Sequence, residues 1–170
     1  MRTIILALGI CTGFAAAQQP PDTPAALRVQ DNQKLFLKAQ GRGTQIYTCK
    51  SGDNGPAWTL KGPDAQLFNA SGKLVARHYA GPTWQANDGS SVKGKVLASA
   101  PAPRANAVPW LLLSAAVHEG NGIMTKAENI QRLHTAGGKA PATGCDAAHI
   151  GNETSVHYTA DYYFYSAPGQ

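Results

Sequence analysis

Short runs of β-branched and aromatic residues recur along this chain, and Gly, Pro, Asn and Asp fill the stretches between them. This pattern is typical of antiparallel sheets, in which short strands are joined by turns. The 18 Gly, 11 Pro and 15% charged residues disfavour long helices with many ion pairs. We therefore predict an all-β fold, a single antiparallel β-sandwich or barrel of roughly 8–10 strands with room for one short helix. The pattern does not choose between sandwich and barrel.

The strands are expected at 34–38, 44–49, 58–60, 66–68, 73–79, 83–84, 91–99, 110–118 and 156–165. Residues 123–135 fit a strand, which the preceding Gly-Asn-Gly connection favours, although two helical turns over 126–134 are an alternative. Residues 136–151 are expected to form an ordered loop. In the last strand, period two predicts one core face and one face that lines a surface. The core face holds Val156, Tyr158, Ala160, Tyr162 and Phe164, and the other face holds His157, Thr159, Asp161, Tyr163 and Tyr165.

The N-terminus has the anatomy of a signal peptide. A basic start at Arg2 precedes an apolar stretch, and Ala15, Ala16 and Ala17 are the small residues expected at a cleavage site. A membrane anchor is the alternative, but the apolar stretch is shorter than the roughly 20 residues needed to span a bilayer. A lipid anchor at Cys11 is a further alternative, disfavoured by the bulky Ile10. We predict a signal peptide at 1–17, an extended segment at 18–26 and a single β domain at 27–170, secreted or periplasmic after cleavage near Ala17.

Removal of the leader leaves two cysteines in a compartment that permits disulfides. A single bridge between Cys49 and Cys145 is therefore predicted. A reactive thiol or half of a metal site is the alternative, but the chain has no C-x-x-C spacing.

The charge of the chain says little about its partners. The 15 basic and 10 acidic residues give +5, and loss of Arg2 leaves 14 − 10 = +4. No three basic residues follow one another, so nucleic-acid binding has no support in the sequence. No membrane span is expected beyond the leader, and the oligomeric state is not predicted.

Several strings carry a family resemblance: GTQIYTC at 43–49, WTLKGPDA at 58–65, HYAGPTW at 78–84, PWLLL at 109–113 and TAGG at 135–138. On these motifs the chain resembles the exported bacterial and fungal domain-of-unknown-function family 3455. The resemblance covers nearly all of the mature chain and implies no mechanism. Fungal members are sometimes labelled malate dehydrogenase, and we reject that activity here. A dinucleotide site needs G-x-G-x-x-G before a helix, whereas Ile46 stands where the third glycine belongs and a strand follows.

The sequence holds candidate residues for two kinds of site, a hydrolytic site and a metal site. His78 and Asp88, near Ser90 and Ser91, could form a hydrolytic acid, base and nucleophile set if their strands make a hairpin. The alternative is that Asp88 caps its own turn and His78 bonds locally. The five histidines lack H-x-H or H-E-x-x-H spacing, so no metal site is predicted, and no cofactor is expected.

Large rings on the expected strands offer a third chemistry, a platform for a small molecule or a glycan, although most such rings in a β domain belong to its core. The candidate binding residues are Trp84, Arg132, His157, Asp161 and Tyr163. The leading hypothesis is an exported, non-enzymatic β domain that binds a small molecule, glycan or envelope component. A secreted hydrolase using His78 and Asp88, and a structural envelope protein with no ligand, are the alternatives. The hydrolase needs those two side chains within hydrogen-bonding reach, and the binder needs two exposed rings around one pocket.

Overall fold

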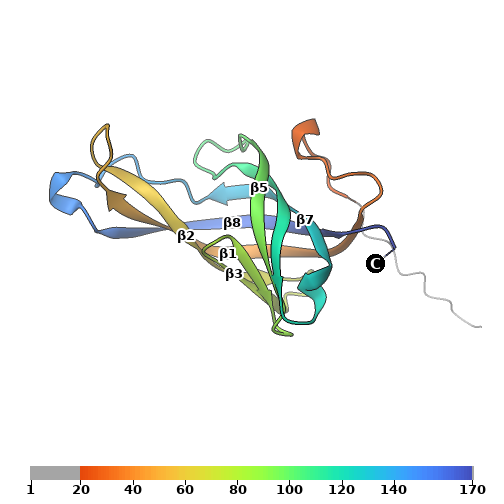
Figure 1. The fold of residues 1–170 in the computed structure, drawn as a ribbon. Helices are drawn as coiled ribbons and strands as arrows, with labels where there is room; N and C mark the ends of the chain where they lie inside the picture. Colours follow the sequence, from red (N-terminus) through yellow and green to blue (C-terminus); the bar gives the residue numbers. More distant parts are fainter. Residues whose placement is uncertain (1–19, 170) are drawn as a thin grey trace, which may run out of the picture.

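The computed structural model describes residues 20–169 as one antiparallel sheet that closes on itself into a barrel of eight strands. Each strand pairs with the next, and the last pairs with the first, which confirms the all-β prediction (Figure 1). The strands are β1 (Lys34–Lys50), β2 (Ala57–Phe68), β3 (Leu74–Tyr79), β4 (Thr83–Ala86), β5 (Ser91–Ala100), β6 (Trp110–Glu119), β7 (Ala127–Gly137) and β8 (Glu153–Ser166). Three single-turn 3₁₀ helices, η1 (Ala25–Leu27), η2 (Ile123–Lys126) and η3 (Ala147–His149), complete the described elements. The predicted signal peptide lies outside the described residues.

Two pairs of expected short strands prove to be single long ones. The expected runs at 34–38 and 44–49 are both part of β1, and those at 58–60 and 66–68 are both part of β2. The glycines between them do not break the strand. A Cβ added at Gly43 would lie 2.1 Å from the carbonyl oxygen of Asp64, so glycine lets β1 and β2 approach closely.

The stretch expected as a strand at 123–135 contains two elements, a short 3₁₀ helix followed by a strand. Residues 123–126 form η2, and residues 127–137 form a strand, so the helical alternative for 126–134 is wrong. Parts of the ordered loop expected at 136–151 have regular secondary structure, since β7 continues to Gly137 and η3 occupies 147–149.

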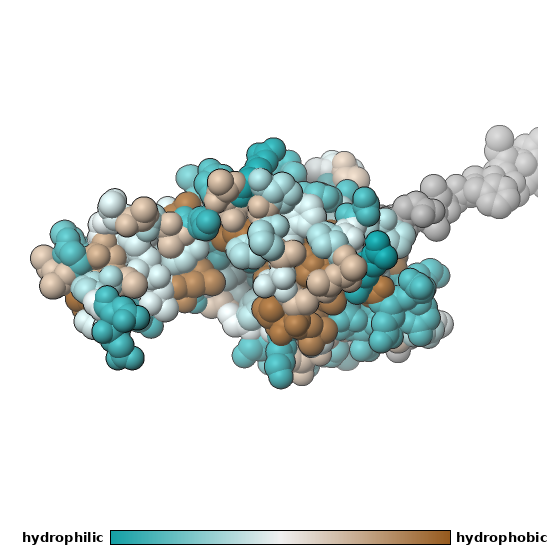
Figure 2. Space-filling view, turned by 90° about the horizontal axis from the view of Figure 1, so that it is seen from above, coloured by the Kyte–Doolittle hydropathy of each residue, from teal (hydrophilic) through white to brown (hydrophobic). Residues whose placement is uncertain are grey.

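Strands of unequal length give the molecule an elongated shape, which the space-filling view in Figure 2 also shows. Figure 1 shows β1, β2 and β8 running along most of its length, while β3, β5 and β7 gather toward one end. Beyond these shorter strands β1, β2 and β8 form an arm, which ends in the 51–56 turn and the 138–152 connection. The arm and the barrel share the same three strands, so the arm is a direct extension of the barrel wall.

The barrel interior is filled by the residues that period two placed inside. Tyr158, Tyr162 and Phe164 are buried there together with Trp84 and Ile130. The rings of Trp84 and Phe164 meet edge to face with centroids 5.9 Å apart, an arrangement that aromatic pairs prefer. The expected core face of the last strand is therefore confirmed from Tyr158 to Phe164, while Val156 is only partly buried.

The opposite face of β8 is not a surface throughout. Tyr163 and Tyr165 are 3% and 2% exposed, because the N-terminal segment folds back over the outside of the sheet. Leu27 of η1 is fully buried against them, and its carbonyl accepts a hydrogen bond of 2.6 Å from Nε2 of Gln131. The expectation that this face lines a surface is wrong for these two tyrosines, since the proline-rich segment supplies a second, outer core.

No helix within residues 20–169 is long and apolar enough to cross a membrane.

Substitution of Gly41 by Ala is expected to destabilise the barrel. The added Cβ would lie 2.6 Å from Cε2 of Tyr162, whose ring is fully buried in the core. Overpacking of this kind costs about 1–3 kcal/mol, measurable as the free energy of unfolding in urea. Gly52→Ala is the control, because its nearest neighbour would be at an ordinary 3.5 Å. Equal stability of the two variants would contradict the packing described for Tyr162.

Candidate ligand cavity of the barrel

A cavity of about 270 Å³ lies among side chains contributed by strands β1 to β7. Most of its lining is apolar, namely Leu60, Pro63, Pro82, Trp84, Val96, Leu111 and Leu113. The polar side chains that line it are Gln45, Lys61, His78 and Arg132. An apolar hollow with a few polar groups is the usual composition of a small-molecule site.

Trp84 and His78 form one wall of the cavity. Their rings stack with centroids 4.3 Å apart and planes within 5° of parallel. Gly94 on β5 makes room for the indole, because a Cβ there would lie 3.0 Å from Cζ3 of Trp84. The indole Nε1 of Trp84 is buried and has no hydrogen-bond partner within the described residues.

His78 is uncharged in this environment. Burial is the main cause that lowers the pKa of its imidazole to about 3; the hydrogen bond to Thr83 opposes this shift, and the nearby positive charge of Arg132 adds to it. Nδ1 lies 2.9 Å from the carbonyl oxygen of Thr83, so the neutral ring donates its proton there. The ring thus serves as a neutral wall of the cavity.

Arg132 brings a positive charge into the barrel from β7. It has the same parity on the strand as the buried Ile130. Its Nε and Nη2 both donate to the carbonyl oxygen of Pro109, at 3.2 and 2.9 Å. Among residues 20–169 no carboxylate lies within 4.0 Å of its guanidinium. Within the described residues, the guanidinium of Arg132 is therefore bonded to a neutral carbonyl oxygen and is not paired with a carboxylate.

Two tyrosine hydroxyls lie near this charge. The hydroxyls of Tyr158 and Tyr162 are 3.2 Å apart inside the barrel. Burial raises the pKa of both phenols, and the positive charge of Arg132 partly opposes that rise. Both phenols therefore stay protonated at neutral pH and can donate hydrogen bonds.

Gln45 adds another donor that the protein itself leaves unused. Its side chain is 1% exposed, and its Nε2 has no hydrogen-bond partner within the described residues. A buried polar group without a partner costs roughly 1–3 kcal/mol. Gln45 and Trp84 are thus two lining residues whose side chains each carry a buried, unpaired donor.

The two main residues of the predicted hydrolytic set, His78 and Asp88, form hydrogen bonds with different partners. Asp88 accepts from the backbone N–H and hydroxyl of Ser90, at 2.9 and 2.6 Å, and from the N–H of Ile123 at 2.8 Å. These bonds, first the one from the Ser90 hydroxyl, lower the pKa of Asp88. No hydrogen bond joins Asp88 to His78 within residues 20–169. Asp88 holds the β4–β5 turn against η2, as in the turn-capping alternative to the hydrolytic set.

The other predicted binding residues lie outside the cavity. His157 is exposed and borders a shallow hollow beside Arg42. Asp161 lies on the outer wall, where its Oδ2 is 3.1 Å from Nδ1 of His134 and 3.9 Å from Nζ of Lys38. Tyr163 belongs to the buried outer core, with its hydroxyl 3.5 Å from the same carboxylate oxygen. The structure therefore brings together Trp84, Arg132 and His78 and separates them from His157, Asp161 and Tyr163.

His134 reaches Asp161 because the strand is irregular there. Its φ is 50°, and the β7–β8 register shifts between Leu133 and Ala136. A bulge of this kind turns a side chain away from its alternating direction. Sequence reasoning had no signal for this pair, since the bulge depends on the register of the neighbouring strand.

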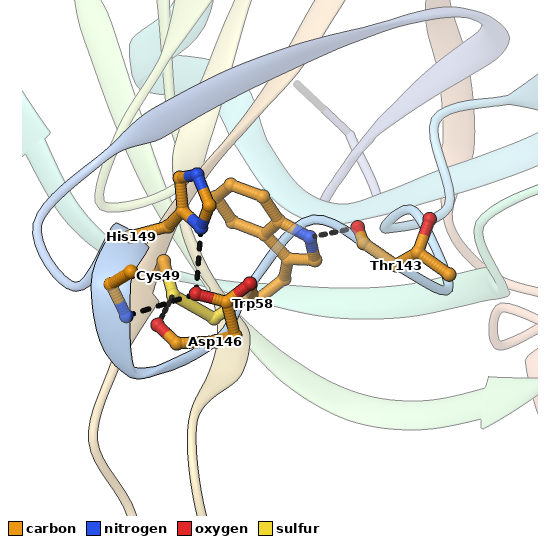
Figure 3. A network of polar contacts seen from close by, with 7 residues as sticks. Cys49, Trp58, Thr143, Asp146 and His149 are labelled. Atoms are coloured by element: carbon orange, nitrogen blue, oxygen red, sulfur yellow. Dashed lines mark hydrogen bonds and ion pairs between the residues drawn. A yellow bond between two sulfur atoms is a disulfide. The ribbon is translucent and has the colours of Figure 1, made fainter.

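The predicted disulfide joins Cys49 and Cys145 at the tip of the arm, with Cα atoms 5.3 Å apart (Figure 3). Around it, Nε1 of Trp58 donates to the carbonyl oxygen of Thr143 at 2.9 Å. The carboxylate of Asp146 lies 2.6 Å from Nδ1 of His149. That hydrogen bond lowers the pKa of Asp146. These contacts confirm the bridge and give the connection before β8 a fixed conformation.

No group of three or more His, Cys, Asp or Glu residues within 20–169 is arranged to hold a metal ion.

Sequence reasoning missed several cavity residues. Gln45 lies in the strand expected at 44–49, but it has neither a charge nor an aromatic ring that would indicate a binding residue. Leu111 and Leu113 belong to a continuous apolar run, in which no single residue stands out as a cavity residue. Alternation within that run, as for Trp84 and Ala86, identifies the inward positions once a barrel is assumed. Gln45 of β1 and Arg132 of β7 line the same cavity because the sheet curves into a barrel.

These observations define a class of protein, a closed eight-stranded antiparallel barrel with a mostly apolar, partly open cavity that the two cations Lys61 and Arg132 line. The chain belongs to the family described as Protein of unknown function (DUF3455), whose match spans residues 30–166. No curated protein matches the chain, and no solved structure matches it.

Proposed function

We propose that this protein is an exported, non-enzymatic binding protein that holds a small, largely apolar molecule in the barrel cavity. The observation that carries the proposal is the cavity of about 270 Å³ lined by Leu60, Val96, Leu111 and Leu113. An eight-stranded barrel is just wide enough to enclose one small ligand. The volume is near the lower end of those that bind small molecules, so a compact ligand fits best.

The lining favours an apolar ligand over a glycan. Sugar rings are commonly held against exposed aromatic faces with many polar groups around them. Trp84, the ring that lines the cavity, is 1% exposed and stacks on His78. Aliphatic side chains dominate the remaining wall, so apolar contact is what this cavity offers most.

The disulfide supports the exported part of the proposal. The Cys49–Cys145 bridge is stable in oxidising compartments, as expected after passage out of the cytosol. A secreted or periplasmic protein that encloses an apolar molecule shields it from water. Secretion and the cleavage near Ala17 remain part of this proposal.

Saturable binding of a neutral apolar probe tests the proposal. Titration with N-phenyl-1-naphthylamine, whose fluorescence rises in apolar surroundings, is expected to show one site per chain. Val96→Trp places a large ring on a lining residue that is 50% exposed and is expected to weaken binding at least tenfold by filling the cavity.

Val117→Trp is the matched control. Val117 is 48% exposed on β6 and does not line the cavity, so this variant should bind the probe like the unmodified protein. Absence of saturable binding, or equal weakening by both substitutions, would remove the cavity as the binding site.

A further inference from the structure

Resting on the proposed function, we infer that the ligand carries a carboxylate, and that Arg132 binds this carboxylate inside the barrel. The apolar wall would then hold the rest of the molecule.

The first support is the unbalanced charge of Arg132. Arginine stays protonated in proteins, and a charge withdrawn from water without an opposite charge is unfavourable. Arg132 is partly buried and, within the described residues, has the Pro109 carbonyl and no carboxylate beside it. Lys61 also lines the cavity, but its charge is already balanced, because its Nζ lies 2.7 Å from a carboxylate oxygen of Glu153. The cavity thus retains one positive charge that a ligand can neutralise.

The second support is a pair of buried, unpaired donors on two residues that line the same cavity. Nε1 of Trp84 and Nε2 of Gln45 belong to side chains that are each 1% exposed, and neither atom has a partner within the described residues. Buried polar groups are normally hydrogen-bonded, so these two donors indicate an acceptor that the protein chain does not supply. Oxygen atoms of an anionic group meet this need.

The kind of anion follows from the single charge. Arginine binds carboxylates and phosphates alike through its planar fork. A phosphate monoester would bring nearly two negative charges into a mostly apolar cavity that holds one unpaired cation. A carboxylate brings one negative charge and matches Arg132. A compact amphipathic acid is therefore the ligand class that this cavity fits.

Displacement of N-phenyl-1-naphthylamine by three compounds with the same alkyl chain tests the inference. Octanoate is expected to displace the probe at a concentration at least tenfold below that of 1-octanol at pH 7.5, and also below that of octyl phosphate. Equal potency of octanoate and 1-octanol would overturn the carboxylate and leave the cavity as an apolar site. A preference for octyl phosphate would overturn the choice of anion. Failure of the probe itself to bind would instead contradict the proposed function.

Variants at Arg132 locate the effect. Arg132→Gln is expected to remove the preference for octanoate while 1-octanol keeps its potency, and Arg132→Lys is expected to retain part of the preference because the charge remains. If Arg132→Gln does not fold, Arg132→Lys and the comparison in the unmodified protein still decide the question. An unchanged preference in a folded Arg132 variant would show that another group binds the acid.

Discussion

Replacement of both cysteines by serine, in a Cys49→Ser and Cys145→Ser double variant, is expected to lower the free energy of unfolding by about 4–5 kcal/mol. The bridge closes a loop across a sequence separation of 96 residues. A crosslink of that span removes much conformational freedom from the unfolded chain. Urea unfolding at neutral pH, compared with the oxidised protein, measures the difference.

The position of the bridge makes the experiment specific. Cys49 and Cys145 lie at the tip of the arm, and neither lines the barrel cavity. The folded double variant should therefore still bind the apolar probe, although it unfolds at lower urea. The unmodified protein under full reduction should match the double variant. A loss below about 1 kcal/mol would mean that the connection before β8 is held mainly by its other contacts, such as the Trp58 to Thr143 hydrogen bond.

Acidification is expected to destabilise the protein between pH 7.5 and 5 by about 2 kcal/mol through His78 alone. In the folded protein burial lowers the pKa of His78 to about 3, whereas the unfolded side chain has its ordinary value of 6.5. Between these values the unfolded state binds one more proton, so stability falls as the pH falls. The slope approaches about 1.4 kcal/mol per pH unit once the pH is well below 6.5.

This pH window isolates His78 from the carboxylates. The pKa values of Asp88 and Glu153 are lowered from 3.8 and 4.5, so their contributions to stability are lost only at more acidic pH. His78→Gln should remove the slope above pH 5, whereas His134→Gln should keep it, because His134 is 45% exposed at its side chain. A free energy of unfolding that stays level from pH 7.5 to 5 in the unmodified protein would contradict a buried, neutral His78.

Local sequence pattern predicted much of this fold. The alternation in β8 identified Tyr158, Tyr162 and Phe164 as core, and the two cysteines that follow the predicted signal peptide identified the bridge. Both features depend on residues close in sequence or on a simple choice of partners. Closure of the sheet was left open, because pairing of β1 with β8 joins opposite ends of the chain and leaves no mark in local composition.

The outer core shows a second limit of what the sequence pattern can predict. Three prolines among residues 18–26 predicted an extended segment, and this composition carried no sign that Leu27 packs over Tyr163 and Tyr165. Alternation told the two faces of β8 apart but could not tell which of them another segment covers. For the same reason the sequence grouped Trp84 and Arg132, which line one cavity, with Asp161 and Tyr163, which lie on the other side of the barrel wall.

The pairing of β1 with β8 has a consequence for biosynthesis. Lys34 is paired with Ser166, so the first strand has no permanent neighbour on one side until nearly the whole polypeptide has been made. Contacts between such distant residues form late and slowly. A nascent chain with this topology therefore cannot close its barrel before β8 has left the ribosome.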